Sequence, residues 1–170
     1  PSSYISGNGE IFITVTNSNG CYSVARVNLK VVEPVYSTAL KDKTICVEDR
    51  TTLDAGPGFS GYEWSTGATT QSISGVSVGS YWVKLKTGNC ITTQTVNVNP
   101  TTQPVIASID IANNTITVNA TGGTTPYEYS SDGTNWQISN VLTNLPRGEN
   151  KVYLRDANKC APVMIQVTVP

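Results

Sequence analysis

Apolar and polar residues alternate in short stretches along the chain, and each stretch ends in a turn. In the first, Ile11, Ile13 and Val15 alternate with other side chains over residues 9–16. Side chains two residues apart lie on the same face of a strand, so the pattern predicts a strand whose apolar face points inward. The turn that follows is rich in Asn and Gly, which tolerate the positive φ angles of hairpin turns. A second apolar stretch, residues 24–32, predicts the returning strand.

This hairpin pattern returns twice, and the repeat defines the units of the chain. Each copy begins at a glycine and ends its turn at a cysteine: Gly9 to Cys21, Gly79 to Cys90, and Gly148 to Cys160. The inward positions of the later copies are Tyr81, Val83 and Leu85, and then Asn150, Val152 and Leu154. Their closing strands are expected over residues 92–98 and 163–169. The sequence YEWS at 62–65 also returns, as YEYS at 127–130, about 65 residues further along.

Prolines mark the boundaries between these units. Pro34 ends the first unit, and Pro100 and Pro104 flank the boundary between the second and the third. Proline suits such junctions because it cannot donate a ladder hydrogen bond and it stiffens a linker. We therefore predict three units, residues 1–34, 35–100 and 101–170. The first lacks the YEWS half and holds the last strands of a truncated repeat, so we expect either that upstream sequence completes it or that the hairpin docks on its neighbour.

Seven short strands are expected in the second unit, over residues 36–40, 44–47, 51–54, 61–65, 70–73, 80–86 and 91–98. Seven strands with turns every ~8 to 12 residues are typical of an immunoglobulin-like β-sandwich. Tyr62 and Trp64 share one face of their strand, so we expect both rings in the core between the sheets. The predicted fold class is all-β, with tandem immunoglobulin-like β-sandwich domains.

Composition and charge exclude several functions. Charged residues are 14% of the chain, the formal net charge is −1 and histidine is absent. Without a basic surface we expect no nucleic-acid partner, and no apolar run reaches the roughly 20 residues of a membrane-spanning helix. The first residues lack the layout of a signal peptide, so we expect a soluble segment whose export signal lies outside it.

Catalytic motifs are not evident in the chain. We find no nucleophile elbow, no glycine-rich phosphate loop and no paired carboxylates at a recognisable spacing, and the lack of histidine removes the commonest general base. We predict that the chain is not an enzyme and uses no cofactor.

The four cysteines, Cys21, Cys46, Cys90 and Cys160, are far apart in the sequence. Isolated cysteines in a small polar β protein favour disulfides made in an oxidising compartment. Cys46 and Cys90 lie in one unit, so we predict that they form a disulfide, with a redox or metal site as the alternative. Closing that loop would stabilise the unit by on the order of 4 kcal/mol. The partner of Cys21 is expected in the missing upstream part of its repeat.

Several motifs resemble a known family of repeats. They are TIC at 44–46, YEWSTG at 62–67 and GSYWV at 79–83, followed by PYEYS at 126–130, NLPRG at 144–148 and RDANKC at 155–160. The second unit resembles the Ig-like, PKD-like repeats of exported Bacteroidetes proteins. The third is similar to the SprB-type repeats of gliding-motility adhesins that the type IX secretion system exports. Asn150 departs from the family pattern, and the third unit lacks an early cysteine, which leaves Cys160 without an evident partner in its unit.

The resemblance implies a non-catalytic stalk or adhesion segment of a large secreted cell-surface protein, acting in surface attachment or gliding motility. The implied partners are neighbouring repeats of the same polypeptide, surface glycans, and the type IX machinery, reached through a C-terminal domain that this chain does not include. The implied location is extracellular, at the cell surface. The alternative is a group of carbohydrate-binding accessory domains of a secreted glycan-degrading enzyme.

Two tryptophans are candidate ligand platforms. Trp82 alternates away from the inward face of its strand and Trp136 lies in a loop, so either ring could stack on a sugar. Packing is the favoured alternative, against a neighbouring unit for Trp82 and as a cap over the sandwich end for Trp136. Asp132, Asp156 and Asn158 offer oxygen ligands but lack a regular calcium-loop spacing, so we expect turn residues and no metal site.

Overall fold

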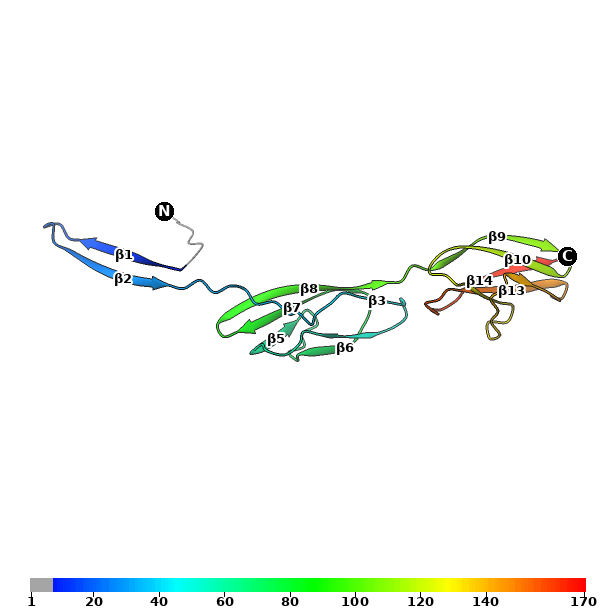
Figure 1. Ribbon diagram of the computed structural model, residues 1–170, viewed down its shortest axis with the longest axis horizontal. Helices are drawn as coiled ribbons and strands as arrows, with labels where there is room; N and C mark the ends of the chain where they lie inside the picture. The colour runs from blue at the N-terminus through cyan, green and yellow to red at the C-terminus, as the bar shows by residue number, and fades with distance from the viewer. Residues whose placement is uncertain (1–7) are drawn as a thin grey trace.

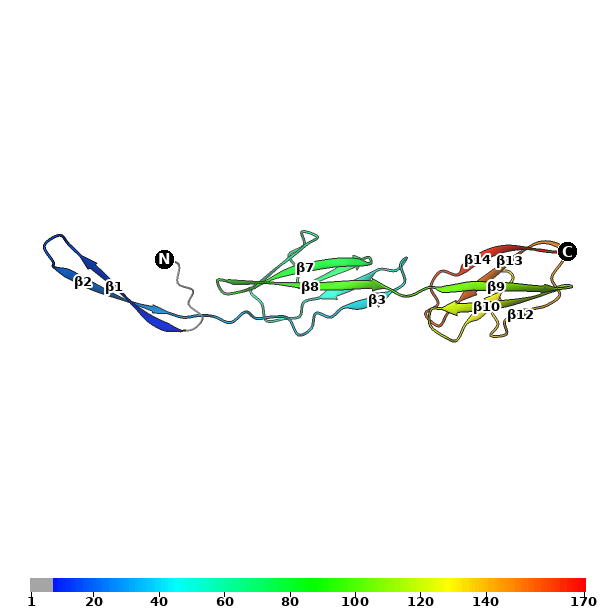
Figure 2. The same cartoon turned by 90° about the horizontal axis from the view of Figure 1, so that it is seen from above.

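The computed structural model describes residues 8–170, which form fourteen β-strands and no helix. A hairpin and two β-sandwiches follow one another along the long axis (Figures 1 and 2). The predicted fold class, all-β with tandem immunoglobulin-like sandwiches, is confirmed. Over the same residues there is no helix of the length and hydropathy needed to cross a membrane.

The N-terminal hairpin consists of β1 (Gly9–Thr16) and β2 (Tyr22–Leu29), paired antiparallel along their whole length. Its turn is closed by Asn17, whose side-chain oxygen accepts hydrogen bonds from the backbone N–H groups of Asn19 and Cys21 at 3.0 Å each. Gly20 takes the positive φ angle, +78°, that the turn requires. Fifteen of the sixteen strand residues are exposed and the last, Leu29, is half-buried, so this hairpin has no core of its own.

The first sandwich contains six strands in two sheets. They are β3 (Lys43–Ile45), β4 (Thr51–Asp54), β5 (Gly61–Trp64), β6 (Ser72–Val76), β7 (Gly79–Thr87) and β8 (Cys90–Pro100). One sheet has the order β3-β8-β7-β5 and the other pairs β4 with β6. All pairs are antiparallel except β3 with β8, which run in the same direction.

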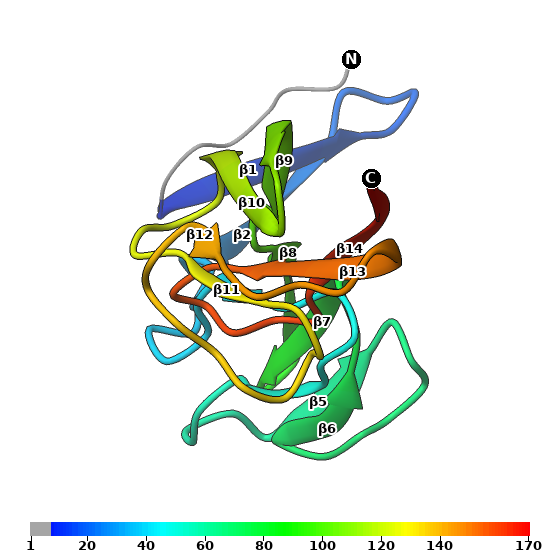
Figure 3. The same ribbon diagram turned by 90° about the vertical axis from the view of Figure 1, so that its right-hand side faces the viewer.

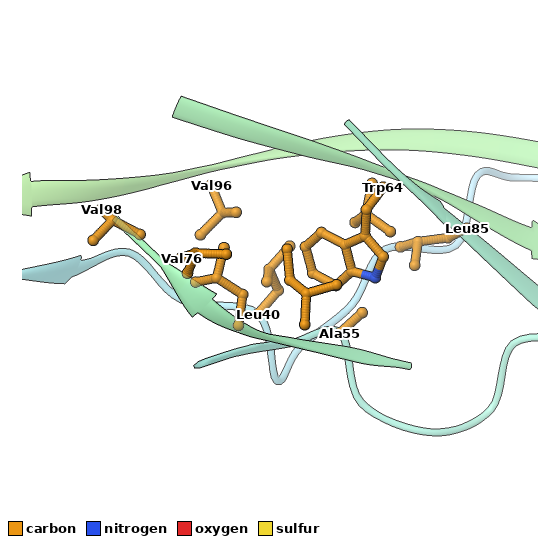
Figure 4. Packing of buried hydrophobic residues seen from close by; sticks show 10 residues of the cluster. Leu40, Ala55, Trp64, Val76, Leu85, Val96 and Val98 are labelled. Carbon is orange, nitrogen blue, oxygen red and sulfur yellow. The ribbon is translucent and has the colours of Figure 1, made fainter. Parts of the chain in front are cut away.

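Trp64 lies at the centre of the first core (Figure 4). Its side chain is 1% exposed, and its indole N–H donates a 2.8 Å hydrogen bond to the carbonyl of Thr70. Val83 and Leu85 from β7 and Leu53 from β4 are fully buried around it. The predicted core role of Trp64 is confirmed, and Tyr62 packs against the same cluster as a half-buried residue.

The prediction of a strand over residues 36–40, the first of the seven expected strands, is wrong, because this segment forms no β-ladder. A side chain takes the place of a strand partner there. The Gln94 amide accepts a hydrogen bond from the Ser37 backbone N–H at 2.8 Å and donates one to the Ser37 carbonyl at 3.1 Å. The Ser37 hydroxyl then accepts from the N–H of Leu40, which bends the chain and buries Leu40 in the core.

The second sandwich also contains six strands in two sheets. They are β9 (Pro104–Ala112), β10 (Thr115–Gly122), β11 (Glu128–Ser130), β12 (Val141–Leu142), β13 (Gly148–Arg155) and β14 (Val163–Val169). The sheet orders are β12-β10-β9 and β11-β13-β14. Figure 3 looks along the long axis from this end and shows β9 and β10 in a different layer from β13 and β14. Its core shares no residue with the first core, and residues 101–103, between β8 and β9, belong to no strand.

The three hairpins open with the same kind of pair, although their turns differ in length. The opening glycine lies opposite an aliphatic residue in each: Gly9 with Leu29, Gly79 with Val98, and Gly148 with Val169. The repeat seen in the sequence is therefore also a repeat of backbone pairing.

Replacing Trp64 by alanine should cost about 3 to 5 kcal/mol of unfolding free energy, because it leaves a large cavity in the first core. The matched variant Trp82→Ala removes a tryptophan from the opposite face of the same sheet and should cost less than about 1 kcal/mol. Urea unfolding followed by circular dichroism measures both. Equal losses in the two variants would contradict the assigned core role.

Candidate functional site

The joint between the two sandwiches brings together three segments that are distant in the sequence. They are the loop after β3, the crossing residues 101–103, and the turn between β13 and β14. β8 leads from the first sandwich directly across this joint into β9 (Figure 1). The contacts described next join both sandwiches to the crossing segment.

A disulfide bond crosses this joint. Cys46 of the first sandwich is bonded to Cys160 of the second, with a Cα–Cα distance of 5.4 Å and a sequence separation of 114 residues. Both cysteines are buried, at 8% and 7% exposure. Cys21 and Cys90 are free thiols, the first exposed and the second half-buried.

The predicted disulfide between Cys46 and Cys90 is therefore wrong, and the strand directions explain why. Cys46 directly follows Ile45, which pairs with Pro100 at the last residue of β8, whereas Cys90 is the first residue of that strand. A strand of this length spans about 30 Å, since each residue advances roughly 3.3 Å. Disulfide formation needs Cα atoms within about 7 Å, so these two cysteines lie at opposite ends of the sandwich.

Hydrogen bonds reinforce the disulfide on both sides. The Glu48 carboxylate accepts a 2.5 Å hydrogen bond from the backbone N–H of Ala161, which links the two sandwiches a second time. The Thr101 N–H donates to the carbonyl of Ile45 at 2.9 Å, and the Thr101 hydroxyl lies 3.2 Å from the sulfur of Cys160. The crossing segment thus contacts the disulfide itself.

Asp156 holds the turn that presents Cys160. Its carboxylate is 2% exposed and accepts hydrogen bonds from the backbone N–H groups of Thr124 at 2.8 Å and Asn158 at 3.0 Å. Gly123, at φ +60°, passes so close that a Cβ atom there would lie 2.6 Å from the Asp156 carboxylate. Asp156 and Asn158 are thus turn residues: the Asp156 oxygens accept from backbone N–H groups, and the Asn158 side-chain amide donates to Asp156 and to the Thr124 hydroxyl.

Within residues 8–170, three potential metal ligands gather at one place, the joint: Cys46, Glu48 and Cys160. The two sulfur atoms are bonded to each other, so neither is available as a thiolate ligand. The chemistry that this cluster performs is covalent cross-linking.

Trp82 lies on the outer face of the β3-β8-β7-β5 sheet and is 37% exposed. The Lys84 ammonium lies 5.2 Å from its ring centroid and also forms a 2.9 Å ion pair with Glu63 on β5. This hydrogen bond and the lysine charge lower the pKa of the Glu63 carboxyl. One side of the indole therefore faces a cation.

Trp136 is half-buried, and the Arg155 guanidinium stacks on it at 4.0 Å from the ring centroid. Arg155 is fixed in turn by Glu128, its neighbour across the β11–β13 ladder, through a 2.6 Å ion pair. The contact with a β13 side chain places Trp136 against a sheet. Trp82 and Trp136 belong to different sandwiches and do not form one site.

The loop before Trp136 is ordered by Asp132. Its carboxylate accepts hydrogen bonds from the backbone N–H groups of Thr134 and Asn135 at 2.8 Å each, and from the Ser130 hydroxyl at 2.8 Å. These donors, Asn135 first, lower the pKa of Asp132 well below its usual range. Asp132 is thus a loop-capping residue.

A groove of about 440 Å³ lies beside β6 in the first sandwich. Hydroxyl groups dominate its polar lining: Thr66, Thr70, Ser72, Ser74, Ser77 and Tyr81. No ionisable carboxylate, amine or thiol lines it, and neither candidate tryptophan does. The lining hydroxyl groups therefore have no carboxylate, amine or imidazole beside them in the groove lining that could activate one as a nucleophile.

No protein-family model matches the chain, and no curated protein matches its sequence. Structural likeness extends to extracellular domains 3–5 of Drosophila OTK, with 11% identity and a TM-score of 0.35 over 96% of this chain and 71% of that one. The immunoglobulin domains 1–4 of Sidekick-1 are 12% identical, with a TM-score of 0.36 over 98% of this chain and 59% of that one. An I-band fragment of titin is 12% identical, with a TM-score of 0.35 over 95% of this chain and 73% of that one. These values concern the fold alone, and the functional argument rests on the geometry above.

Alkylating the unreduced protein should label two thiols per chain, Cys21 and Cys90, because the other two cysteines are bonded to each other. Peptide mapping by mass spectrometry should then find one cross-linked peptide pair, containing Cys46 and Cys160. Recovering Cys46 linked to Cys90 would contradict the structure.

Proposed function

We propose that the chain is a non-catalytic stalk or adhesion segment of a large secreted cell-surface protein, with units at residues 1–34, 35–100 and 101–170. The observation that carries this proposal is the disulfide bond between successive sandwiches. A cross-link at a joint suits a protein that must transmit force or hold a binding end at a distance from the cell.

The path of the chain supports this role. The chain enters the first sandwich at one end, leaves it at the other, and continues in the same direction through the second to its C-terminus (Figures 1 and 2). The entering strand β3 and the leaving strand β8 are parallel neighbours, with Ile45 opposite Pro100. Without the disulfide, tension along the long axis would pull these strands past each other and load their hydrogen bonds together; with the bond intact, the load passes from β3 through Cys46 to Cys160.

The disulfide also limits how far the chain can extend. It closes a loop between Cys46 and Cys160, a separation of 114 residues, and of the buried residues of the two cores only Leu40 and Val169 lie outside this loop. Unfolding inside the loop cannot lengthen the chain, because the loop is closed. A segment built in this way keeps its reach when it is pulled.

Pulling single molecules from both termini should show this limit directly. Reduction should add about 400 Å to the extended length, since each released residue contributes up to roughly 3.6 Å. Force spectroscopy with and without a thiol reductant measures the difference. Full extension of the oxidised chain would contradict the proposed load path.

Two double variants provide the matched comparison. Replacing Cys46 and Cys160 by serine should give the longer extension even without reductant. Replacing Cys21 and Cys90 removes the same number of thiols but should leave the short extension unchanged, because neither belongs to the cross-link.

The motif resemblance supports a more specific setting, namely surface attachment or gliding motility of a bacterium that uses type IX secretion. In that setting the segment is extracellular, and its partners are neighbouring repeats, surface glycans and the secretion machinery. The disulfide fits an oxidising compartment outside the cytosol.

Carbohydrate-binding accessory domains remain the second proposal, and the exposure of Trp82 is what favours it. A flat indole at a surface can stack on a sugar ring. Trp136 is a weaker platform, because the Arg155 guanidinium already covers one side of its ring.

A glycan array separates the two proposals. We expect the wild-type chain to give at most weak signals, since neither tryptophan lines a groove with polar groups to orient a sugar. Strong binding that disappears in folded Trp82→Ala or Trp136→Ala protein would instead establish the carbohydrate-binding function. Circular dichroism confirms that the variants are folded.

A further inference from the structure

The β1–β2 hairpin exposes a face that the two other hairpins bury. On this face Ile11 pairs with Val27 and Ile13 with Ala25, and Val15 continues the apolar row. Ile11, Ile13 and Val15 are 38%, 51% and 67% exposed. Counted from the opening glycine, Val83 and Val152 correspond to Ile13, and Leu85 and Leu154 correspond to Val15. All four of these residues are 0% exposed.

The register shows what should cover this face. Counting from Gly9 and Gly79, Ile13 corresponds to Val83 and Val15 to Leu85, and each opening glycine faces an aliphatic residue across the ladder. In the first sandwich the cover is supplied by the strands that precede the hairpin, with Leu53, Trp64 and Ile73. A hairpin whose apolar residues lie at the same distances from its opening glycine fits the same kind of cover.

The free thiol of Cys90 independently indicates a partner for the unit that contains the β1–β2 hairpin. Cys90 directly follows the turn of the β7–β8 hairpin as the first residue of β8, Cys160 lies in the turn after β13, and Cys160 is bonded to a cysteine of the unit before it. Cys90 is half-buried and unbonded. The corresponding partner of Cys90 would be a cysteine at the position of Cys46 in the unit that contains the β1–β2 hairpin.

The connecting segments also match. The sequence EPVY at 33–36 follows Leu29 by four residues, and QPVI at 103–106 follows Val98 by five. Leu29 and Val98 are the register partners of the opening glycines Gly9 and Gly79. The spacing between hairpin and next unit is thus preserved to within one residue, which would bring the two joints to the same geometry.

We propose that the open face of the β1–β2 hairpin binds the first half of an immunoglobulin-like repeat joined ahead of it, and that this half-repeat carries a cysteine that bonds to Cys90. The occupant is a set of strands like β3 to β6 of residues 43–76, in which β4 and β6 form the facing sheet and Trp64 of β5 fills the core. The two thiols lose two protons and two electrons to a disulfide oxidant such as oxidised glutathione, which is reduced to two thiols. The inference concerns a second joint and holds whether or not the chain acts as a stalk.

A chimera tests the proposal. Residues 35–78 are copied and joined directly to Gly9 of residues 9–170, so that the new junction reproduces the bond between Val78 and Gly79. With oxidised glutathione present, Cys46 of the added copy should bond to Cys90, and alkylation should label one thiol, Cys21. Amide hydrogen exchange over residues 11–15 should slow by at least about a hundredfold, because the hairpin joins a cooperative unit.

Matched variants identify the cause of these changes. Ile13→Asp on the open face, or Trp64→Asp in the added copy, should abolish both the exchange protection and the new disulfide. Thr14→Asp on the opposite face of β1 should preserve both. If Cys90 stays labelled and exchange stays fast in the chimera, the proposal is wrong.

The competing occupant is a second copy of this chain. Sedimentation of the original 170-residue chain carrying Cys21→Ser and Cys90→Ser, which removes both free thiols and so prevents disulfide dimers, should show a monomer at micromolar concentration. Dimerisation that Ile13→Asp removes would assign the open face to self-association and overturn the proposal.

Discussion

The burial of one face of a β-hairpin beneath a second sheet is the interaction on which the rest of this structure depends. The β7–β8 and β13–β14 hairpins each place fully buried aliphatic residues, such as Val83 and Val152, against strands that come earlier in the same unit. Where this cover is present, the unit has a core that removes apolar surface from water. The β1–β2 hairpin has the same spacing of apolar residues from its opening glycine without the cover, and its apolar residues are exposed. A two-stranded hairpin alone is only marginally stable in water. The covering sheet therefore accounts for the difference between the two hairpins that have a core and the β1–β2 hairpin that has none.

Once two such units are formed, the joint between them decides the behaviour of the whole chain. Each core is small, and domains of this size have limited stability of their own. The bond between Cys46 and Cys160 restricts their relative movement, and the contacts of Glu48 and Thr101 add to it. Because the bond connects different units, it acts mainly on the relative position and extension of the two units. This distinguishes it from a disulfide within one sandwich, which would stabilise a single core.

The polar and aromatic residues considered as candidate sites take part in local structure. Glu63 and Glu128 each pair with the basic residue opposite on the next strand, and each of those basic residues lies over a tryptophan. Cation–π pairs of this kind contribute about 0.5 to 1 kcal/mol at exposed sites. Asp132 and Asp156 order the two loops that the oxygen-rich sequence had marked as candidate calcium ligands.

Local patterns in the sequence were enough to locate strands, hairpins and the core tryptophan, because alternation and turn chemistry act over a few neighbouring residues. Residues 51–54 and 163–169 were expected as strands and form β4 and β14, and the expected burial of Trp64 is observed. The structure of segment 36–40 could not be predicted from local patterns, since Ser37 bonds to the side chain of Gln94, 57 residues away. The partner of Cys46 likewise required the directions of β3 and β8, which place it at the end of the sandwich opposite Cys90. Tertiary structure alone decided that pairing, because a disulfide depends on the distance between two Cα atoms in space and sequence proximity does not fix that distance.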